Sequence, residues 1–358
     1  AAFDRSFNRV VFSAAHVVAD PFTASDPTGR AAIDWEKTLA FRHYLVSLGL
    51  GIAEAMDTAQ RGMGLDWPGA LELIRRTKQD LPQALVFNGA GTDHLDARDA
   101  RGLDDIRRAY VEQIEAIQQA GGRIILMASR ALAKVARSPD DYIAIYREAL
   151  ARCDQPVILH WLGEMFDPAL AGYWGADHFD KTLETCLAVI GENRTKVDGI
   201  KISLLDKDKE IVMRRRLPEG VKMYTGDDFS YPELIAGDEH GYSHALLGIF
   251  DPLAPAAAFA MSRLAAGDKK GFHAVLDPTV KLARLIFRAP TQHYKTGVVF
   301  LAWLNGFQDH FIMLNGAQAL RPLPYFTEVF RLADGCGLLR DPELALRRMK
   351  KLLALYGV

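Results

Sequence analysis

Lys201 is the residue of this sequence whose surroundings point most directly to chemistry. It interrupts the apolar run VDGIKIS at residues 197–203. Burial disfavours the charged form of an amine, and a neutral amine can attack a carbonyl carbon to form a Schiff base. The alternative is a lysine that reaches water at the end of the run or pairs there with an acid. The run therefore makes Lys201 a candidate nucleophile.

A histidine ends the preceding apolar run, PVILH at residues 156–160. His160 can take up or release a proton near neutral pH, so it is a candidate acid–base group. The alternative is a ring packed against Trp161 with both nitrogens satisfied. Polar residues at or beyond the ends of the runs are candidates for binding a substrate. They are Asp57, Thr58, Asn88, His94, Ser203, Asp227 and His244.

These side chains can act together only if the fold brings the ends of the runs to one place. Short β-rich runs alternate with helical patterns, which is typical of βα units and a parallel sheet. We predict strands at residues 9–15, 51–56, 84–88, 123–128, 156–160, 199–203, 222–225 and 241–246, with helices between them, most clearly at 34–47, 103–119 and 139–152. This pattern favours a closed (β/α)8 TIM barrel, whose active site lies at the carboxyl ends of the strands. An open doubly wound sheet is the alternative, but no GxGxxG opens a helix after the first strand.

The β-rich runs stop near residue 251, and helical patterns follow at 254–266, 272–287, 296–304 and 342–356. We therefore expect a barrel at residues 1–250 and a helical C-terminal extension, packed on the barrel, at 251–358. The extension carries Phe300, Trp303, Phe307 and Phe311, more aromatic surface than a small extension needs to bury. This excess predicts self-association.

Composition excludes several classes of protein. The 43 basic and 45 acidic side chains give a formal net charge of -2, and no long basic run suggests nucleic acid as a partner. No stretch of 18 or more apolar residues suggests a membrane span. The 3 cysteines are far apart and form no CxxC pair, which favours a reducing compartment over a disulfide framework. We expect a cytoplasmic protein.

Two of the runs resemble a known family. PVILHWLG followed by VDGIKIS is similar to strands five and six of the dihydrodipicolinate synthase / N-acetylneuraminate lyase superfamily, and to a bacterial branch of it. The segments DYIAIYREALARCDQ and KMYTGDDFSYPELIAGDEHGYSHALLGIFDPLAP also fit, so the resemblance covers residues 120–266. It implies a class I aldolase or hydro-lyase barrel that acts on a small-molecule carbonyl substrate without metal or cofactor. It further implies a homodimer or homotetramer, with Lys201 as the Schiff-base lysine.

The sequence departs from the family pattern at three places. The family usually ends strand five with a tyrosine that relays protons, and His160 stands here instead. At strand two, a Gly-Thr-Thr-Gly-Glu turn that binds a carboxylate is replaced by MDTAQRG at residues 56–62. Asp57 would repel a carboxylate and could hold sugar hydroxyls, or it could merely cap a helix. Either a keto acid or a keto-sugar is therefore expected as the substrate.

The third departure is an insertion between His160 and Lys201 that holds Phe166, Tyr173, Trp174 and His178. Loops after barrel strands form the walls and lids of active sites. Its aromatic rings could stack on a sugar or lie at a subunit contact.

Two other functions compete with a Schiff-base lyase. The first is a metal-dependent barrel isomerase or hydrolase of a sugar-like substrate, since imidazoles and carboxylates can hold a divalent ion. Its candidate ligands are His16, Asp57, His94, His160, Glu164 and His244, although no HxH or HExxH pair appears. The second is a barrel that binds a small molecule without turning it over.

Overall fold

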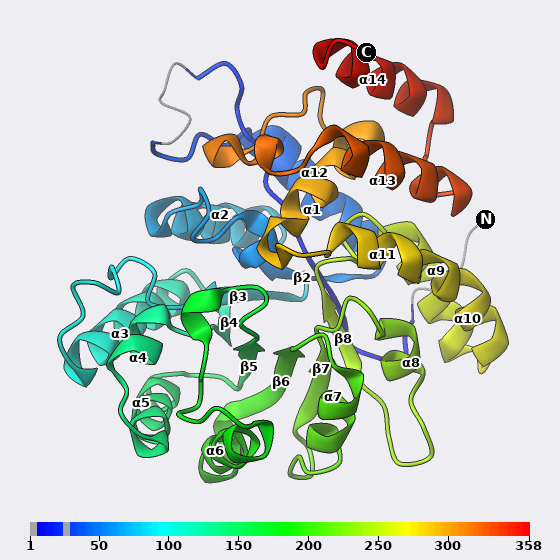
Figure 1. Ribbon diagram of the computed structural model, residues 1–358. Coiled ribbons are helices and arrows are strands. Elements are labelled where there is room, and N and C mark those ends of the chain that lie inside the picture. The colour runs from blue at the N-terminus through cyan, green and yellow to red at the C-terminus, as the bar shows by residue number, and fades with distance from the viewer. Residues whose placement is uncertain (1–5, 24–28) are drawn as a thin grey trace. The chain divides into compact units, whose positions relative to one another are not determined.

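The barrel predicted from the alternating runs is present. The computed structural model describes residues 6–23 and 29–358. Its strands form a closed barrel in the order β1-β2-β3-β4-β5-β6-β7-β8 (Figure 1). Their bounds are β1 (Val11–Ala14), β2 (Gly51–Glu54), β3 (Val86–Ala90), β4 (Arg123–Leu126), β5 (Val157–Leu162), β6 (Val197–Ser203), β7 (Lys222–Thr225) and β8 (His244–Leu247). Each overlaps a predicted strand, so the (β/α)8 prediction is confirmed.

Strand β6 carries Lys201, and its pairing with β5 sets the position of that lysine. The two strands run parallel, with an irregularity in register between Val157 and Ile158. Beyond this irregularity His160 lies beside Lys201 in the ladder. The pairing therefore brings together the candidate nucleophile and the candidate acid–base group, which are far apart in the sequence.

Residues 53–55 and 67–246 form one compact unit, which we call the barrel unit. Its helices are α2 (Trp67–Asp80), α3 (Leu103–Gln119), α4 (Arg130–Val135), α5 (Pro139–Ala151), α6 (Phe179–Glu192), α7 (Lys207–Arg214) and α8 (Tyr231–Ala236). Side-chain caps fix where some of them begin: Ser129 accepts the Leu132 N–H at α4, and Asp206 accepts the Lys209 N–H at α7. Helix α5 packs against both α3 and α6 (Figure 1).

Residues 1–52, 56–66 and 247–358 form the second compact unit, which we call the terminal unit. Besides β1 it contains α1 (Trp35–Ser47), the 3-10 turn η1 (Asp57–Ala59), α9 (Ala254–Ala265), α10 (Lys269–Leu276), α11 (Val280–Ile286), α12 (Tyr294–Leu304), α13 (Leu323–Gly335) and α14 (Pro342–Leu355). This unit thus joins the start of the chain to the residues that we predicted as a C-terminal extension.

The aromatic residues of α12 and the loop after it pack within the terminal unit. The Trp303 and Phe311 rings stack with centroids 5.6 Å apart, and Phe300 lies 4.9 Å from Phe326. Phe307 makes an edge contact with Phe41 at 4.9 Å. These aromatic residues therefore have contacts within the chain, although Phe307 and Phe311 remain partly exposed.

Two predicted element boundaries are wrong for identifiable reasons. The helix predicted at residues 272–287 is broken into α10 and α11, because Pro278 lies between them and cannot donate a backbone hydrogen bond. Strand β8 begins at His244 and not at Gly241, because Gly241 forms an antiparallel bridge with Asp238. Helix α13 was not predicted.

The described helices include none that is long and apolar enough to cross a membrane. Cys153, Cys186 and Cys336 are free thiols. Burial raises the pKa of the Cys153 thiol to about 12, which makes that side chain a weak nucleophile.

Candidate active site

Lys201 lies on β6 and is almost completely buried, with 8% of its surface exposed. In the ladder it pairs with His160 of β5 on one side and Tyr224 of β7 on the other. The flanking Ile200 and Ile202 are buried as well. A lysine side chain in such surroundings is shielded from bulk water.

His160 is the ionisable neighbour of Lys201. Its Nε2 lies 3.2 Å from the Ser203 hydroxyl oxygen. Burial, and then the positive charge of Lys201, hold the pKa of His160 well below its usual range. The imidazole is therefore neutral near pH 7, with one nitrogen able to donate and the other able to accept a hydrogen bond. Lys201, His160 and Ser203 thus form one cluster.

Gly226 follows β7 and makes room for this cluster. A β-carbon at this position would lie 2.8 Å from Lys201 Cε and 2.7 Å from the Ile202 carbonyl oxygen, and closer still to the Ser203 hydroxyl. Real β-carbons do not approach other atoms so closely, so a larger residue would displace the lysine or the serine. The sequence placed Gly226 directly after the strand predicted at residues 222–225, but we assigned it no role there.

A buried carboxyl group on α7 holds the strand end that precedes Gly226. Glu210 accepts hydrogen bonds from Thr225 at 2.9 Å and Ser243 at 2.7 Å. The Thr225 hydroxyl in turn accepts the Asp227 N–H. Burial raises the pKa of Glu210 to about 8 despite these hydrogen bonds. Glu210 therefore links α7 to the turn at Gly226.

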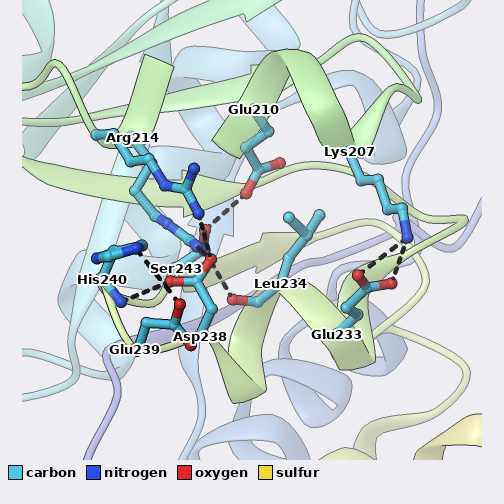
Figure 2. A network of polar contacts seen from close by, with 10 residues as sticks. Lys207, Glu210, Arg214, Glu233, Leu234, Asp238, Glu239, His240 and Ser243 are labelled. Carbon is cyan, nitrogen blue, oxygen red and sulfur yellow. Dashed lines mark hydrogen bonds and ion pairs between the residues drawn. The ribbon is translucent and has the colours of Figure 1, made fainter. Parts of the chain in front are cut away.

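Figure 2 shows that Glu210 belongs to a network of polar contacts that includes Arg214, Asp238 and Ser243, with the Lys207–Glu233 pair beside it. Arg214 reaches toward Ser243 and the Leu234 carbonyl oxygen, and forms an ion pair with Asp238 at 2.9 Å. Lys207 pairs with Glu233 at 2.7 Å, which ties α7 to α8. The network therefore links α7 to α8 and to the segment before β8.

Two predicted substrate-binding residues of the barrel unit make hydrogen bonds to the protein backbone. Asp227 is buried, and its Oδ1 accepts the N–H groups of Phe229 and Ser230 just before α8. Asn88 lies inside β3, because the strand continues to Ala90, and its amide donates to the Arg123 carbonyl oxygen at the start of β4. The Asn88 amide therefore lies away from the carboxyl ends of these strands.

Two histidines from the same prediction lie outside the Lys201 cluster. His94 lies in the loop after β3 and docks on α3, with Nδ1 2.8 Å from Gln113 Nε2 and Nε2 3.3 Å from Glu112. His244 begins β8, so it occupies the amino end of its strand and packs against the Tyr224 and Tyr242 rings. The expectation that His244 lies at the carboxyl end of β8 is wrong, because β8 begins three residues later than predicted.

The two residues predicted after strand two belong to the terminal unit. Asp57 begins the turn η1 and forms an ion pair, at 3.0 Å, with the buried ammonium of Lys295. No side chain caps η1, so the capping alternative for Asp57 is wrong. The Thr58 hydroxyl lies 2.8 Å from the Tyr294 hydroxyl. Lys295 and Tyr294 were missed, because they appeared in the sequence only as part of a helical pattern.

The inserted aromatic residues after β5 pack into the barrel unit. Trp174 is fully buried, with its ring 4.7 Å from that of Tyr146 and 6.0 Å from that of Trp161. The Tyr173 hydroxyl accepts the Ser129 N–H and lies 2.9 Å from the Tyr146 hydroxyl. These rings anchor the insertion against α5 and the strand that carries His160.

The metal-dependent alternative requires a set of ligands in one place. Within residues 6–23 and 29–358, no group of three or more His, Cys, Asp or Glu side chains is arranged to hold a metal ion. The candidate ligands named above belong to separate clusters: His94 contacts α3, whereas Asp57 pairs with Lys295.

Solved structures with the same fold come from the dihydrodipicolinate synthase family. YagE, a prophage protein of that family from E. coli K12 in complex with pyruvate, is 14% identical, with a TM-score of 0.72 over 93% of this chain and 100% of its own. Dihydrodipicolinate synthase from Thermotoga maritima is 14% identical, with a TM-score of 0.69 over 93% and 100%. The enzyme from Aquifex aeolicus is 12% identical, with a TM-score of 0.68 over 93% and 100%. The predicted resemblance is thereby confirmed for the fold.

No curated protein matches the chain. One protein family matches it along its whole length, residues 1–358, and that family is described as "Protein of unknown function (DUF993)". Because this match covers the whole chain, the chain belongs to the family DUF993.

Proposed function

We propose that this protein is a Schiff-base-forming lyase, a class I aldolase or hydro-lyase, with Lys201 as its nucleophile. The observation that carries the proposal is the cluster of Lys201, His160 and Ser203 on neighbouring strands. A buried amine beside a neutral imidazole is suited to attack on a carbonyl group. Gly226 supports the same function, because the absence of a side chain there lets Lys201 and Ser203 pack closely together.

The proposed reaction needs two proton transfers that this cluster can serve. The Lys201 nitrogen attacks the carbonyl carbon, and the carbonyl oxygen takes up a proton to give a carbinolamine. That oxygen then leaves as water and an iminium forms. The iminium accepts the electron pair released by carbon–carbon cleavage or by loss of a substrate hydroxyl. Neutral His160, hydrogen-bonded to Ser203, takes the proton that the attacking nitrogen loses and passes it to the carbonyl oxygen. One further proton from solvent lets that oxygen leave as water.

We propose a small keto acid or keto-sugar as the substrate class. The sequence argument against keto acids rested on the negative charge of Asp57, but Lys295 offsets that charge within the terminal unit. The pyruvate in the YagE structure supports a keto acid as the first class to test. Asp57, Thr58, Asn88, His94, Asp227 and His244 remain proposals as substrate-binding residues, and the backbone bond of Asn88 and the position of His244 weaken those two.

Borohydride trapping tests the mechanism directly. The purified protein is incubated with each of a panel of carbonyl compounds, namely pyruvate, 2-oxobutanoate, dihydroxyacetone and fructose, and reduced. Intact mass spectrometry should then find one stable adduct per chain with at least one compound, and peptide mapping should place it on Lys201. The Lys201→Ala variant should form no adduct.

Lys207→Ala is the matched control, because Lys207 lies close in sequence but is exposed on α7 and pairs with Glu233. It should form the adduct like the wild type, and circular dichroism should show that both variants fold. An adduct that persists in Lys201→Ala would contradict the proposed mechanism but would not affect the assignment of the fold. The same holds if Lys201 stays unmodified with every compound of the panel.

We also propose that the protein is cytoplasmic and that it self-associates as a homodimer or homotetramer. Free thiols support a reducing compartment, and the family resemblance supports an oligomer. One related structure is described as the first monomeric dihydrodipicolinate synthase variant. Light scattering at micromolar concentration should give two or four chains per particle, and a monomer mass would contradict the proposal.

A further inference from the structure

A second buried histidine lies in the terminal unit, outside the Lys201 cluster. His16 follows β1 and Asp251 follows β8, and both are completely or almost completely buried. The carboxylate oxygen Oδ2 of Asp251 lies 2.8 Å from His16 Nδ1 and also accepts the His16 N–H at 2.8 Å. We propose that this pair is a binding site for a hydroxyl group of a small, uncharged polyol, with His16 Nε2 as the acceptor.

The geometry determines which ring nitrogen can accept. A carboxylate oxygen only accepts hydrogen bonds, so the hydrogen of a neutral His16 ring lies on Nδ1, facing Asp251. Nε2 then carries a lone pair. Among the described residues Nε2 has no hydrogen-bond partner, and it is buried. A carboxylate that orients a histidine in this way commonly prepares the other nitrogen for a ligand.

A second polar atom of the pair is also unsatisfied. Asp251 Oδ1 is buried and lacks a hydrogen-bond partner among the described residues. Buried polar atoms without partners are rare in folded proteins, and each calls for a physical explanation. Asp251 Oδ1 and the lone pair of His16 Nε2 both accept, so a ligand that binds them must supply donors.

The charges around the pair select an uncharged donor. The Asp251 carboxylate disfavours an anion. The buried guanidinium of Arg42 donates to the carbonyl oxygens of His16 and Thr38, so its positive charge disfavours an ammonium group. Phe41 lies with its ring centroid 4.4 Å from that of His16, which supplies an apolar wall for a carbon skeleton. A hydroxyl group on a short carbon chain satisfies these conditions.

Nitrogen-15 NMR of the full-length protein labelled at histidine tests the site, with xylitol as the probe. His16 is assigned by the loss of its signals in His16→Gln. We expect Nδ1 to be protonated and Nε2 to carry a lone pair, and we expect the Nε2 signal to shift saturably with xylitol. The same titration followed by thermal unfolding should raise the Tm of the wild type. Asp251→Asn should weaken xylitol binding by about tenfold or more.

The pair formed by His273 and Asp277 is a matched control. His273 Nδ1 lies 3.0 Å from a carboxylate oxygen of Asp277. Both side chains are partly exposed, and the two residues are four positions apart in the sequence. His273→Gln should leave the xylitol response unchanged. The proposal is overturned if Nε2 of His16 is protonated, if its signal does not respond to xylitol because only water binds there, or if His16→Gln keeps the full Tm shift. These outcomes are independent of trapping at Lys201.

Discussion

The protein has a buried histidine in each compact unit, and a comparison of the two shows how the neighbouring group affects the protonation of an imidazole. His160 lies beside the Lys201 amine, which is positive when protonated, and the Ser203 hydroxyl. His16 lies against the Asp251 carboxylate. Both rings are almost completely removed from water. The residue type and the burial are therefore the same, and the sign of the neighbouring charge differs.

Because the neighbouring charges differ, we expect the two rings to have different chemical roles. Burial, and then the charge of protonated Lys201, keep the pKa of His160 low, so this ring can exchange protons while remaining neutral at rest. The carboxylate beside His16 instead fixes which nitrogen of a neutral ring carries the hydrogen, and thereby orients an acceptor. Burial alone does not define the chemistry of a histidine; its partner does.

Removing the imidazole of His160 should have the largest effect. With the keto compound that traps at Lys201, His160→Phe should lower kcat roughly 10²–10⁴-fold while KM changes little, because proton transfer is lost and binding is kept. Steady-state kinetics measures both quantities. His240→Phe is the control, since His240 is exposed and pairs with Glu239. An equal loss in both variants, or a change confined to KM, would contradict a role in proton transfer.

Filling the space at Gly226 should have the next largest effect. A β-carbon there would press on Lys201 and Ser203, so Gly226→Ala should slow adduct formation roughly tenfold or more and cost about 1–3 kcal/mol of stability. Gly191→Ala is the matched control, because a β-carbon at Gly191 meets nothing within 4 Å. Trapping rates that are equal in the two variants would show that the lysine needs no such space.

Breaking the buried pair of His16 and Asp251 should lower stability more than breaking the exposed pair of His273 and Asp277. Asp251→Asn removes a charge-assisted hydrogen bond in a buried place, so the free energy of unfolding should fall by about 1–3 kcal/mol. Asp277→Asn, in the exposed pair with His273, should change it by less than about 0.5 kcal/mol. Urea unfolding gives both values. Similar losses would mean that burial adds nothing to the pair.

Glu210 extends the comparison to a buried acid whose hydrogen bonds come from hydroxyl groups. Its native pKa of about 8 lies above the ordinary value of 4.5. The stability that it contributes is therefore full below about pH 4.5 and is lost as the pH rises toward 8. Glu210→Gln should remove this loss, which is at most about 1.4 kcal/mol per pH unit. Urea unfolding from pH 5 to 8 measures it, and identical slopes in wild type and variant would contradict it.

Much of the barrel and the centre of its candidate site could be predicted from the sequence. The eight strands were predicted because buried parallel strands leave short apolar runs between helical patterns. Lys201 and His160 stand within or at the end of such runs, and parallel pairing of consecutive strands places them side by side. The errors at Asn88 and His244 came from strand ends, which the apolar pattern defines least well.

The pairing of the buried polar side chains could not be predicted, because it depends on contacts between distant parts of the chain. Thr58 meets Tyr294 across 236 positions, and His16 meets Asp251 across 235. Asp57 finds its counter-ion on α12. An apolar pattern reports which positions are buried, because burial depends on the face of a strand or helix. It does not report which polar side chain will lie opposite another, because that depends on how the elements pack.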